Sequence, residues 1–176
     1  LKEKPHRIGI VASGKADQIT FAHGRVDVGV PLAPPVIKAV KKHTGSEEAV
    51  LIDAPPGTSC PVVAAVKDTD FCLLVTEPTP FGLNDLKLAV GMTREMNIPT
   101  GVVINRFMED YKLVTDYCRQ EQIPVLLKIP FAKQYAAAYA RGSSLVQDYP
   151  QWQPAFVELW HKVEGLVQQH ARTTGD

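Results

Sequence analysis

Apolar and polar residues follow one pattern in the first thirty residues and another in the rest of the chain. Near the start, two short apolar runs at residues 8–12 and 19–22 are flanked by glycines and polar turn residues, which is typical of β-strands joined by tight turns. From Pro35 onward, helical and strand-like stretches alternate. The sequence therefore predicts an N-terminal hairpin or small meander followed by an α/β segment.

The strand-like stretches of the second part are almost continuously apolar, as expected for strands of a parallel sheet that is covered on both faces. They lie at residues 49–52, 71–76, 101–104 and 124–129. The helical stretches lie at about residues 35–44, 61–67, 84–96, 108–121 and 132–141, with a final helix after Pro154. This alternation predicts a doubly wound, mainly parallel α/β sheet flanked by helices, which binds ligands at the carboxyl ends of its strands.

The composition restricts which partners and which cellular location we expect for the protein. Nineteen basic residues balance nineteen acidic ones without a basic cluster, so charge gives no reason to expect a nucleic acid or an anionic membrane as partner. No apolar run approaches the roughly 20 residues of a membrane helix. The three cysteines lie far apart in the sequence, which favours a reducing, cytoplasmic location and predicts no metal site.

Asp53 follows the apolar run 49–52 directly and opens the segment DAPPG at residues 53–57. A carboxylate at the tip of a buried strand is costly to desolvate, and a Mg²⁺ ion with its retained waters would satisfy it. Gly57 would let a backbone N–H approach a ligand closely. Asp53 could equally cap the following turn or helix, and the local sequence leaves both interpretations open.

Asn105 stands where the strand-like run 101–104 ends. Its carboxamide both donates and accepts hydrogen bonds, which matches the N6/N7 edge of adenine. Guanine-specific sites place an Asp three residues after such an Asn, and Met108 occupies that position here. Adenine is therefore favoured over guanine, although Asn105 could instead be an ordinary helix N-cap.

Three segments together resemble P-loop ATPases of the MinD/ParA/Mrp type, in the subgroup that carries a ferredoxin-like insertion. They are LIDAPPGTSCPV at 51–62, VTEPT at 75–79 and GLNDL at 82–86, and the resemblance extends over nearly the whole chain. It implies that Asp53 holds a magnesium-bound water and that Gly57 senses the γ-phosphate.

The same resemblance assigns roles at the base-binding end of the site. It implies that Asn105, with its neighbour Arg106, contacts the adenine of ATP. It also implies that Pro130 and Phe131, which follow the run 124–129, line the base pocket. Glu77 lies at a strand end too, but it could be a solvated turn residue.

Residues 9–16 come close to the phosphate-binding pattern G-x-x-x-x-G-K-[ST] without satisfying it. Ala16 has no hydroxyl for Mg²⁺, and strand-like residues follow where a phosphate loop requires a helix. We interpret this segment, including Lys15, as part of the N-terminal hairpin. By resemblance, the phosphate loop and a cysteine-rich insertion with 4Fe-4S clusters precede Leu1. Residues 1–33 are then a hairpin or linker after that insertion, and residues 34–176 are the C-terminal part of the ATPase domain.

The resemblance implies a parent protein that binds ATP and Mg²⁺ between two protomers of a homodimer, through its nucleotide face, and hydrolyses ATP slowly. An unidentified protein partner or the iron–sulfur insertion would receive the signal. Without a phosphate loop, the chain alone is expected to be inactive. The alternative is an α/β docking module that uses no nucleotide. In either case we expect the apolar stripe of the last helix to pack on the sheet, because its polar side carries both charges and not the basic flank of a membrane-binding helix.

Overall fold

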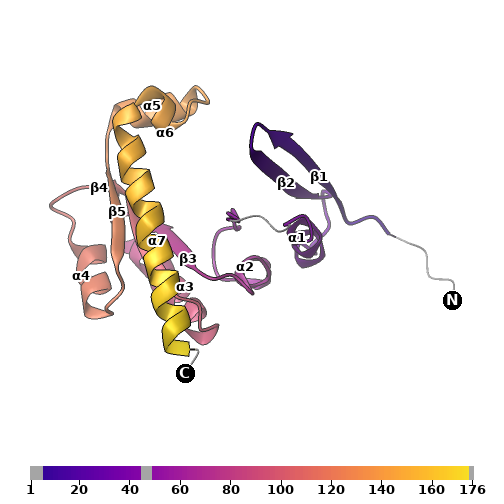
Figure 1. The fold of residues 1–176 in the computed structure, drawn as a ribbon, viewed down its shortest axis with the longest axis horizontal. Coiled ribbons are helices and arrows are strands. Elements are labelled where there is room, and N and C mark those ends of the chain that lie inside the picture. The colour runs from indigo at the N-terminus through magenta and orange to yellow at the C-terminus, as the bar shows by residue number, and fades with distance from the viewer. Residues whose placement is uncertain (1–5, 45–48, 175–176) are drawn as a thin grey trace. The chain divides into compact units, whose positions relative to one another are not determined.

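The computed structural model describes residues 6–44 and 49–174. The chain divides into two compact units, unit 1 with residues Leu1–Asp68 and unit 2 with residues Thr69–Asp176 (Figure 1). The domain boundary expected at residues 33/34 stays a prediction.

Unit 1 begins with an antiparallel hairpin of two strands, β1 (Gly9–Ala16) and β2 (Ile19–Val26). Asp17 turns the chain with a φ of 53°, a left-handed conformation that Asp adopts more readily than most residues. The hairpin prediction is therefore confirmed. Lys15 lies within β1, opposite Thr20, so the segment that nearly matches the phosphate-binding pattern is a strand and not a loop.

Helix α1 (Pro34–Lys41) packs closely on one face of this hairpin (Figure 1). A Cβ atom at Gly24 would lie 2.6 Å from a methyl carbon of Val36 and 2.8 Å from one of Val40. Only glycine leaves room for such a close approach of helix and strand, because any side chain would occupy the space of the two valines. The glycines that suggested turns in the sequence thus also serve packing.

Helix α2 (Cys60–Val66) is the last element of unit 1. The ammonium group of Lys41 donates hydrogen bonds to the carbonyl oxygens of Ala65, at 3.0 Å, and of Lys67. A cation at the carboxyl end of a helix satisfies carbonyls that have no partner inside the helix and interacts favourably with the helix dipole. This contact joins α1 to the end of α2.

The strand expected at residues 49–52 is absent, so this prediction was wrong for the described chain. The segment has no ladder partner, and it leaves large apolar side chains exposed: Val50 by 44%, Leu51 by 85% and Ile52 by 37%. A strand forms only where a neighbour accepts and donates its backbone hydrogen bonds. The apolar run shows that this segment is suited to burial, but no described strand pairs with it.

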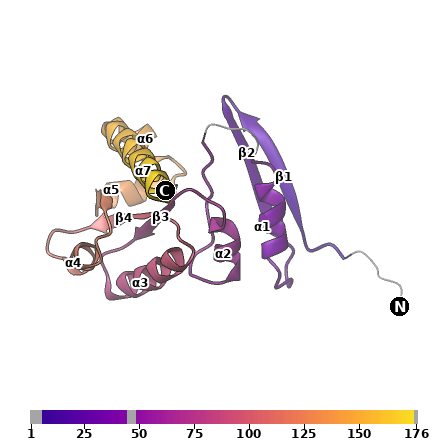
Figure 2. The same ribbon diagram turned by 60° about the horizontal axis from the view of Figure 1, so that its bottom comes forward.

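Unit 2 contains the parallel sheet that the sequence predicts. Its strands are β3 (Cys72–Thr76), β4 (Thr100–Phe107) and β5 (Val125–Pro130), in the order β3-β4-β5. Helices cover both faces, with α3 and α4 on one side and α7 on the other (Figure 2). The helices of unit 2 are α3 (Pro80–Glu95), α4 (Leu113–Gln120), α5 (Lys133–Ala140), α6 (Leu145–Asp148) and α7 (Gln153–Thr174), with a 3₁₀ turn at Pro150–Trp152.

The central strand β4 divides the core of unit 2 into two layers. Val102 and Ile104 are fully buried against α3 and α4, whereas Val103, between them, packs with Leu126 and with Leu159 of α7. This alternation follows from the strand period of two and explains why the whole run is apolar. The expected packing of the last helix on the sheet is confirmed as well.

Two helix boundaries differ from the sequence-based ones for local reasons. Helix α3 starts at Pro80, four residues early, because the Thr79 side chain accepts a 3.0 Å hydrogen bond from the N–H of Gly82 and caps the helix. Helix α4 starts at Leu113, five residues late, because residues 108–112 form a turn. Among the described residues, no helix is long and apolar enough to cross a membrane.

Candidate functional site

A β-bulge at the carboxyl end of β4 shapes the candidate site. Ile104 lies opposite Lys128 and Phe107 opposite Pro130, so the two residues Asn105 and Arg106 face one residue of β5. The ladder resumes directly afterwards, where the N–H of Phe131 donates to the carbonyl of Phe107 at 3.0 Å. A bulge of this kind redirects side chains at the point where pairing is interrupted. The sequence places Asn105 at a strand end, but only the register reveals the bulge.

Arg106 adopts a left-handed backbone conformation with a φ of 51°. This conformation costs a residue with a side chain about 1–3 kcal/mol and persists only where its surroundings hold it. The N–H of Arg106 donates to Oδ1 of Asn105 at 2.9 Å, and its guanidinium lies 3.3 Å from a carboxylate oxygen of Glu77 at the end of β3. Glu77 is thus the ion-pair partner of Arg106, a role that sequence reasoning left open.

The hydrogen bond between these neighbours also orients the Asn105 carboxamide. An N–H group can only donate, so the atom that faces it must be Oδ1, and Nδ2 is left as a donor. No hydrogen-bond partner for Nδ2 is found in residues 6–44 and 49–174. Oδ1 keeps a second lone pair. Asn105 can therefore donate to a ring nitrogen and accept one further hydrogen bond from an amino group.

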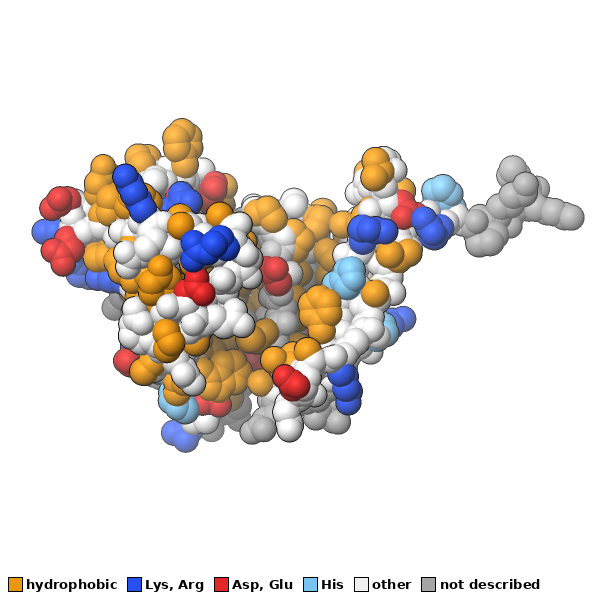
Figure 3. Space-filling model, turned by 90° about the horizontal axis from the view of Figure 1, so that it is seen from above, with side chains coloured by type: hydrophobic (Ala, Val, Ile, Leu, Met, Phe, Trp, Pro, Cys, Tyr) orange, Lys and Arg blue, Asp and Glu red, His pale blue; other side chains and the backbone are white. Residues whose placement is uncertain are grey.

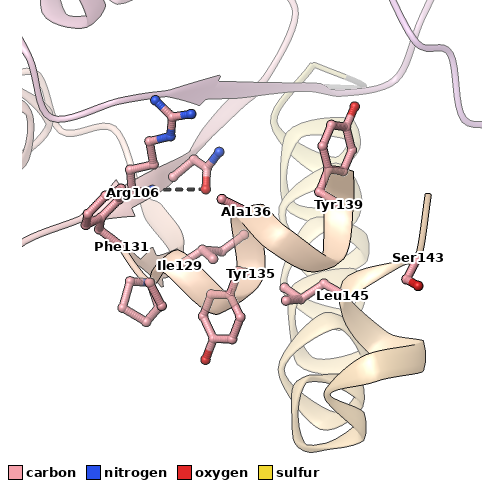
Figure 4. Close-up of a pocket in the computed structure, with 11 residues that line it drawn as sticks. Arg106, Ile129, Phe131, Tyr135, Ala136, Tyr139, Ser143 and Leu145 are labelled. Atoms are coloured by element: carbon pink, nitrogen blue, oxygen red, sulfur yellow. Dashed lines mark hydrogen bonds between the residues drawn. The ribbon is translucent and has the colours of Figure 1, made fainter. Parts of the chain in front are cut away.

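The bulge opens onto a pocket of about 440 Å³ that lies between the ends of β4 and β5 and helix α5 (Figure 4). All four residues that we expected at the base-binding end line this pocket: Asn105, Arg106, Pro130 and Phe131. The remaining lining residues are mostly apolar and were not anticipated: Ile129, Ala132, Tyr135, Ala136, Tyr139, Ser143 and Leu145. A small apolar pocket with a few polar groups at one end is the common form of a ligand site.

A second hollow of about 490 Å³ lies beside α4 and is lined mainly by charged side chains, including Lys112, Lys128 and Glu109. Asp116 and Arg119, also in its lining, form an ion pair with each other. Lys128 lies over the ring of Phe107, 4.6 Å from the centroid. Three of the charged side chains in this hollow, Asp116, Arg119 and Lys128, are thus engaged within the protein, and the apolar pocket at the bulge is the better candidate site.

The two residues expected to sense Mg²⁺ and the γ-phosphate belong to unit 1, whereas every residue that lines the pocket belongs to unit 2. Asp53 is exposed on the segment without regular secondary structure that precedes α2. Gly57 has a φ of 88° and open space around the position of a Cβ atom, so its conformation, and not crowding, requires glycine. The roles of both residues stay predictions.

The described cysteines and acidic residues determine which metal centres this chain could hold. Within the described part of the chain, no three His, Cys, Asp or Glu side chains gather that could hold a metal ion. Cys72 and Cys118 are buried in unit 2, and burial raises the pKa of both thiols, whereas Cys60 is exposed in unit 1. The cysteines present do not fit an iron–sulfur cluster, and a 4Fe-4S cluster would need ligands from elsewhere. A Mg²⁺ ion keeps several of its waters and binds to phosphates, so it needs few protein ligands. The carboxylate of Asp53 is suited to bind such an ion directly or through one of its waters.

Comparison with known proteins gives two curated relatives, both from Methanocaldococcus jannaschii, while no family model matches the chain. The uncharacterized protein MJ0579 is 31% identical over 147 residues, and the uncharacterized protein MJ0578 is 33% identical over 85 residues. These matches cover 82% and 47% of this chain, but 51% and 31% of the relatives. The chain thus spans about half the length of the first relative and a third of the second.

Among solved structures, the MinD cell division protein of Aquifex aeolicus is similar, with a TM-score of 0.54 at 19% sequence identity. The fold is MinD-like. The match covers 86% of this chain and 62% of the MinD chain, so it extends over most of the elements described above. At this level of identity the likeness establishes the fold, and function has to be argued from the site.

Proposed function

We propose that this chain is the base-binding part of a MinD-like ATPase and that it binds an adenine nucleotide with the base in the pocket at the bulge. The bulge at Asn105 and Arg106 carries this proposal. It lies at the carboxyl end of a central parallel strand, which is where doubly wound folds bind their ligands.

The chemistry of the pocket suits a purine base. Its volume of about 440 Å³ and its apolar lining leave room for a flat aromatic ring system. Nδ2 of Asn105 would donate to a ring nitrogen of the base, and the second lone pair of Oδ1 would accept from the N6 amino group of adenine. The guanidinium of Arg106, held by Glu77, is placed at the pocket to lie over the base or to meet a phosphate.

Hydrolysis belongs to the parent protein in this proposal. Asp53 would hold a water of the Mg²⁺ ion, and Gly57 would follow the γ-phosphate through its backbone N–H. A phosphate loop outside this sequence would supply the amides and the lysine that position the phosphates, and Mg²⁺ would neutralise the developing charge. The homodimer through the nucleotide face, the 4Fe-4S insertion, the cytoplasmic location and the unidentified protein partner rest on the family resemblance alone.

Base recognition can be tested with the 176-residue chain by following backbone amide shifts in NMR titrations with AMP and GMP. We expect AMP to shift residues of β4, β5 and α5, and to bind more tightly than GMP. Asn105→Ala should weaken AMP binding by about 1–3 kcal/mol, because base groups are left unpaired. The preference over GMP should shrink with it, since the substitution removes the acceptor that discriminates.

A matched control is Asn84→Ala, which removes an exposed carboxamide from helix α3 without touching the pocket. It should leave both titrations unchanged. Equal affinity of the wild type for AMP and GMP, or unchanged AMP binding in Asn105→Ala, would contradict the assigned role of Asn105. The absence of any shift in β4, β5 and α5 would contradict the proposed function itself.

A further inference from the structure

Helix α5 and the residues that flank it line one side of the pocket. Tyr135, Ala136 and Tyr139 of the helix contribute to the lining, together with Ala132 at its N-cap and Ser143 beyond its end. Ala138, which does not line the pocket, is buried to 1% exposure. The helix thus offers the small side chain of Ala136 and two aromatic rings to the pocket.

The side chain of Tyr139 has no packing role in the fold. Its side chain is 83% exposed, although it is large and mostly apolar. Tyr135, four residues earlier, is different, because its ring packs edge-on against Tyr149 and Trp152 at centroid distances of 4.9 and 5.9 Å. No comparable ring contact of Tyr139 occurs in the described ranges.

The position of Tyr139 gives this unengaged ring a role. Arg106 and Phe131 lie at one side of the pocket and Tyr139 at the other, with the methyl group of Ala136 between them (Figure 4). Phe131 is also exposed, by 52%. A flat ligand above Ala136 would therefore have an aromatic side chain on either side and the Asn105 carboxamide at its edge.

We propose that Tyr139 is a base-stacking residue, which closes the pocket opposite Arg106 and Phe131. This inference rests on the proposed function and divides the recognition of the nucleotide between two residues. Stacking on an aromatic ring is tolerant of base identity, because every base has a π-face, whereas hydrogen bonds to the edge of the base are selective. Tyr139 therefore supplies affinity for any purine, and Asn105 supplies the preference for adenine.

The face of unit 2 that carries α5 and α6 has no strong charge of one sign among the side chains in view. Seen from the end of unit 2 that carries α5 and α6, hydrophobic side chains lie among basic and acidic ones that are interspersed (Figure 3). No single-sign field on this face would draw in a polyanion by charge alone. Contacts to the base then carry a large share of the affinity at this end of the site.

The test compares AMP and GMP binding to the 176-residue chain and its variants by NMR titration. Tyr139→Ala should weaken both nucleotides by about fivefold or more, the lower end of what one base–aromatic contact contributes, and leave their ratio unchanged. Tyr139→Phe should bind within about twofold of the wild type, because the ring is retained. Tyr111→Ala removes a half-exposed tyrosine from the turn after β4, outside the pocket, and should change nothing.

A fluorescent reporter separates stacking from a purely structural effect. In Tyr139→Trp, AMP and GMP should both quench the new indole emission, measured against the wild-type background of Trp152 and Trp160. Wild-type AMP binding together with unchanged affinity in Tyr139→Ala would overturn the stacking role and leave the proposed function standing. No binding of AMP to the wild-type pocket would overturn both.

Discussion

Two glycines of helix α3 offer a sharp test of how this helix is joined to the sheet. Gly82 lies in the first turn, and Gly91 lies three turns along the same helix. A Cβ atom at Gly82 would lie 2.3 Å from the carbonyl oxygen of Glu77 and 3.0 Å from the hydroxyl of Thr76, whereas nothing lies within 4 Å of one at Gly91. The same substitution to alanine should therefore have opposite effects at the two positions.

The expected loss at Gly82 follows from the contacts that must move. The backbone oxygen of Glu77 cannot yield as a flexible side chain would, so the first turn of α3 has to shift away. This shift would strain the cap, in which the Thr79 side chain accepts from the Gly82 N–H. It would also strain the partly buried 2.9 Å hydrogen bond from the Thr76 hydroxyl to the Gly82 carbonyl. Each of these is worth about 1 kcal/mol, and overpacking costs about 1–3 kcal/mol more.

We therefore expect Gly82→Ala to lower the free energy of unfolding of unit 2 by about 2–4 kcal/mol, after allowing for the better helix propensity of alanine. Gly91→Ala should raise it by up to about 1 kcal/mol. Both tryptophans of the chain, Trp152 and Trp160, belong to unit 2, so their fluorescence in a urea titration reports on this unit. If Gly82→Ala stayed within about 0.5 kcal/mol of the wild type, the close approach of α3 to Glu77 would be refuted.

The other predictions concern the buried interior of unit 2. Gly101→Ala should lower the free energy of unfolding by about 1–3 kcal/mol in the same assay, because its Cβ would lie 2.5 Å from a methyl carbon of Leu126. Adding Leu126→Val to this variant should recover part of the loss. An undiminished stability of Gly101→Ala would contradict this packing. A thiol reagent should modify Cys60 alone in the native chain and all three cysteines in denaturant. Burial raises the pKa of Cys72 and Cys118, so these thiols lose their protons at a lower pH in the unfolded state than in the folded state. The free energy of unfolding should therefore be unchanged below the usual thiol pKa of about 8.5 and should decline as the pH rises above it. A double Cys→Ala variant that kept the same decline would show that other groups cause it.

The sequence by itself determined the fold class of this protein and most of its helices and strands. Apolar runs such as residues 101–104 are long enough for strands and too uniform for a half-exposed sheet, so they predicted a parallel sheet covered on both faces. Strand β4 confirms this prediction, because Val102 and Ile104 are buried on one face of the sheet and Val103 on the other. The hairpin at the start was predictable because its two apolar runs are separated by turn residues. Secondary-structure propensity and the pattern of apolar residues act over a few residues, so both can be derived from the sequence.

Tertiary structure decided what depends on partners far apart in the chain. The run 49–52 has the composition of a strand, but a strand needs a neighbour, and none of the described strands pairs with it. The bulge at Asn105 exists because β5 runs one residue short against β4, a property of two strands and not of either sequence. Tyr139 lines the pocket only because α5, in which Ala138 is buried, lies beside the ends of β4 and β5. Register and helix packing depend on contacts between separate segments, so these features of the site could not be derived from the order of residues alone.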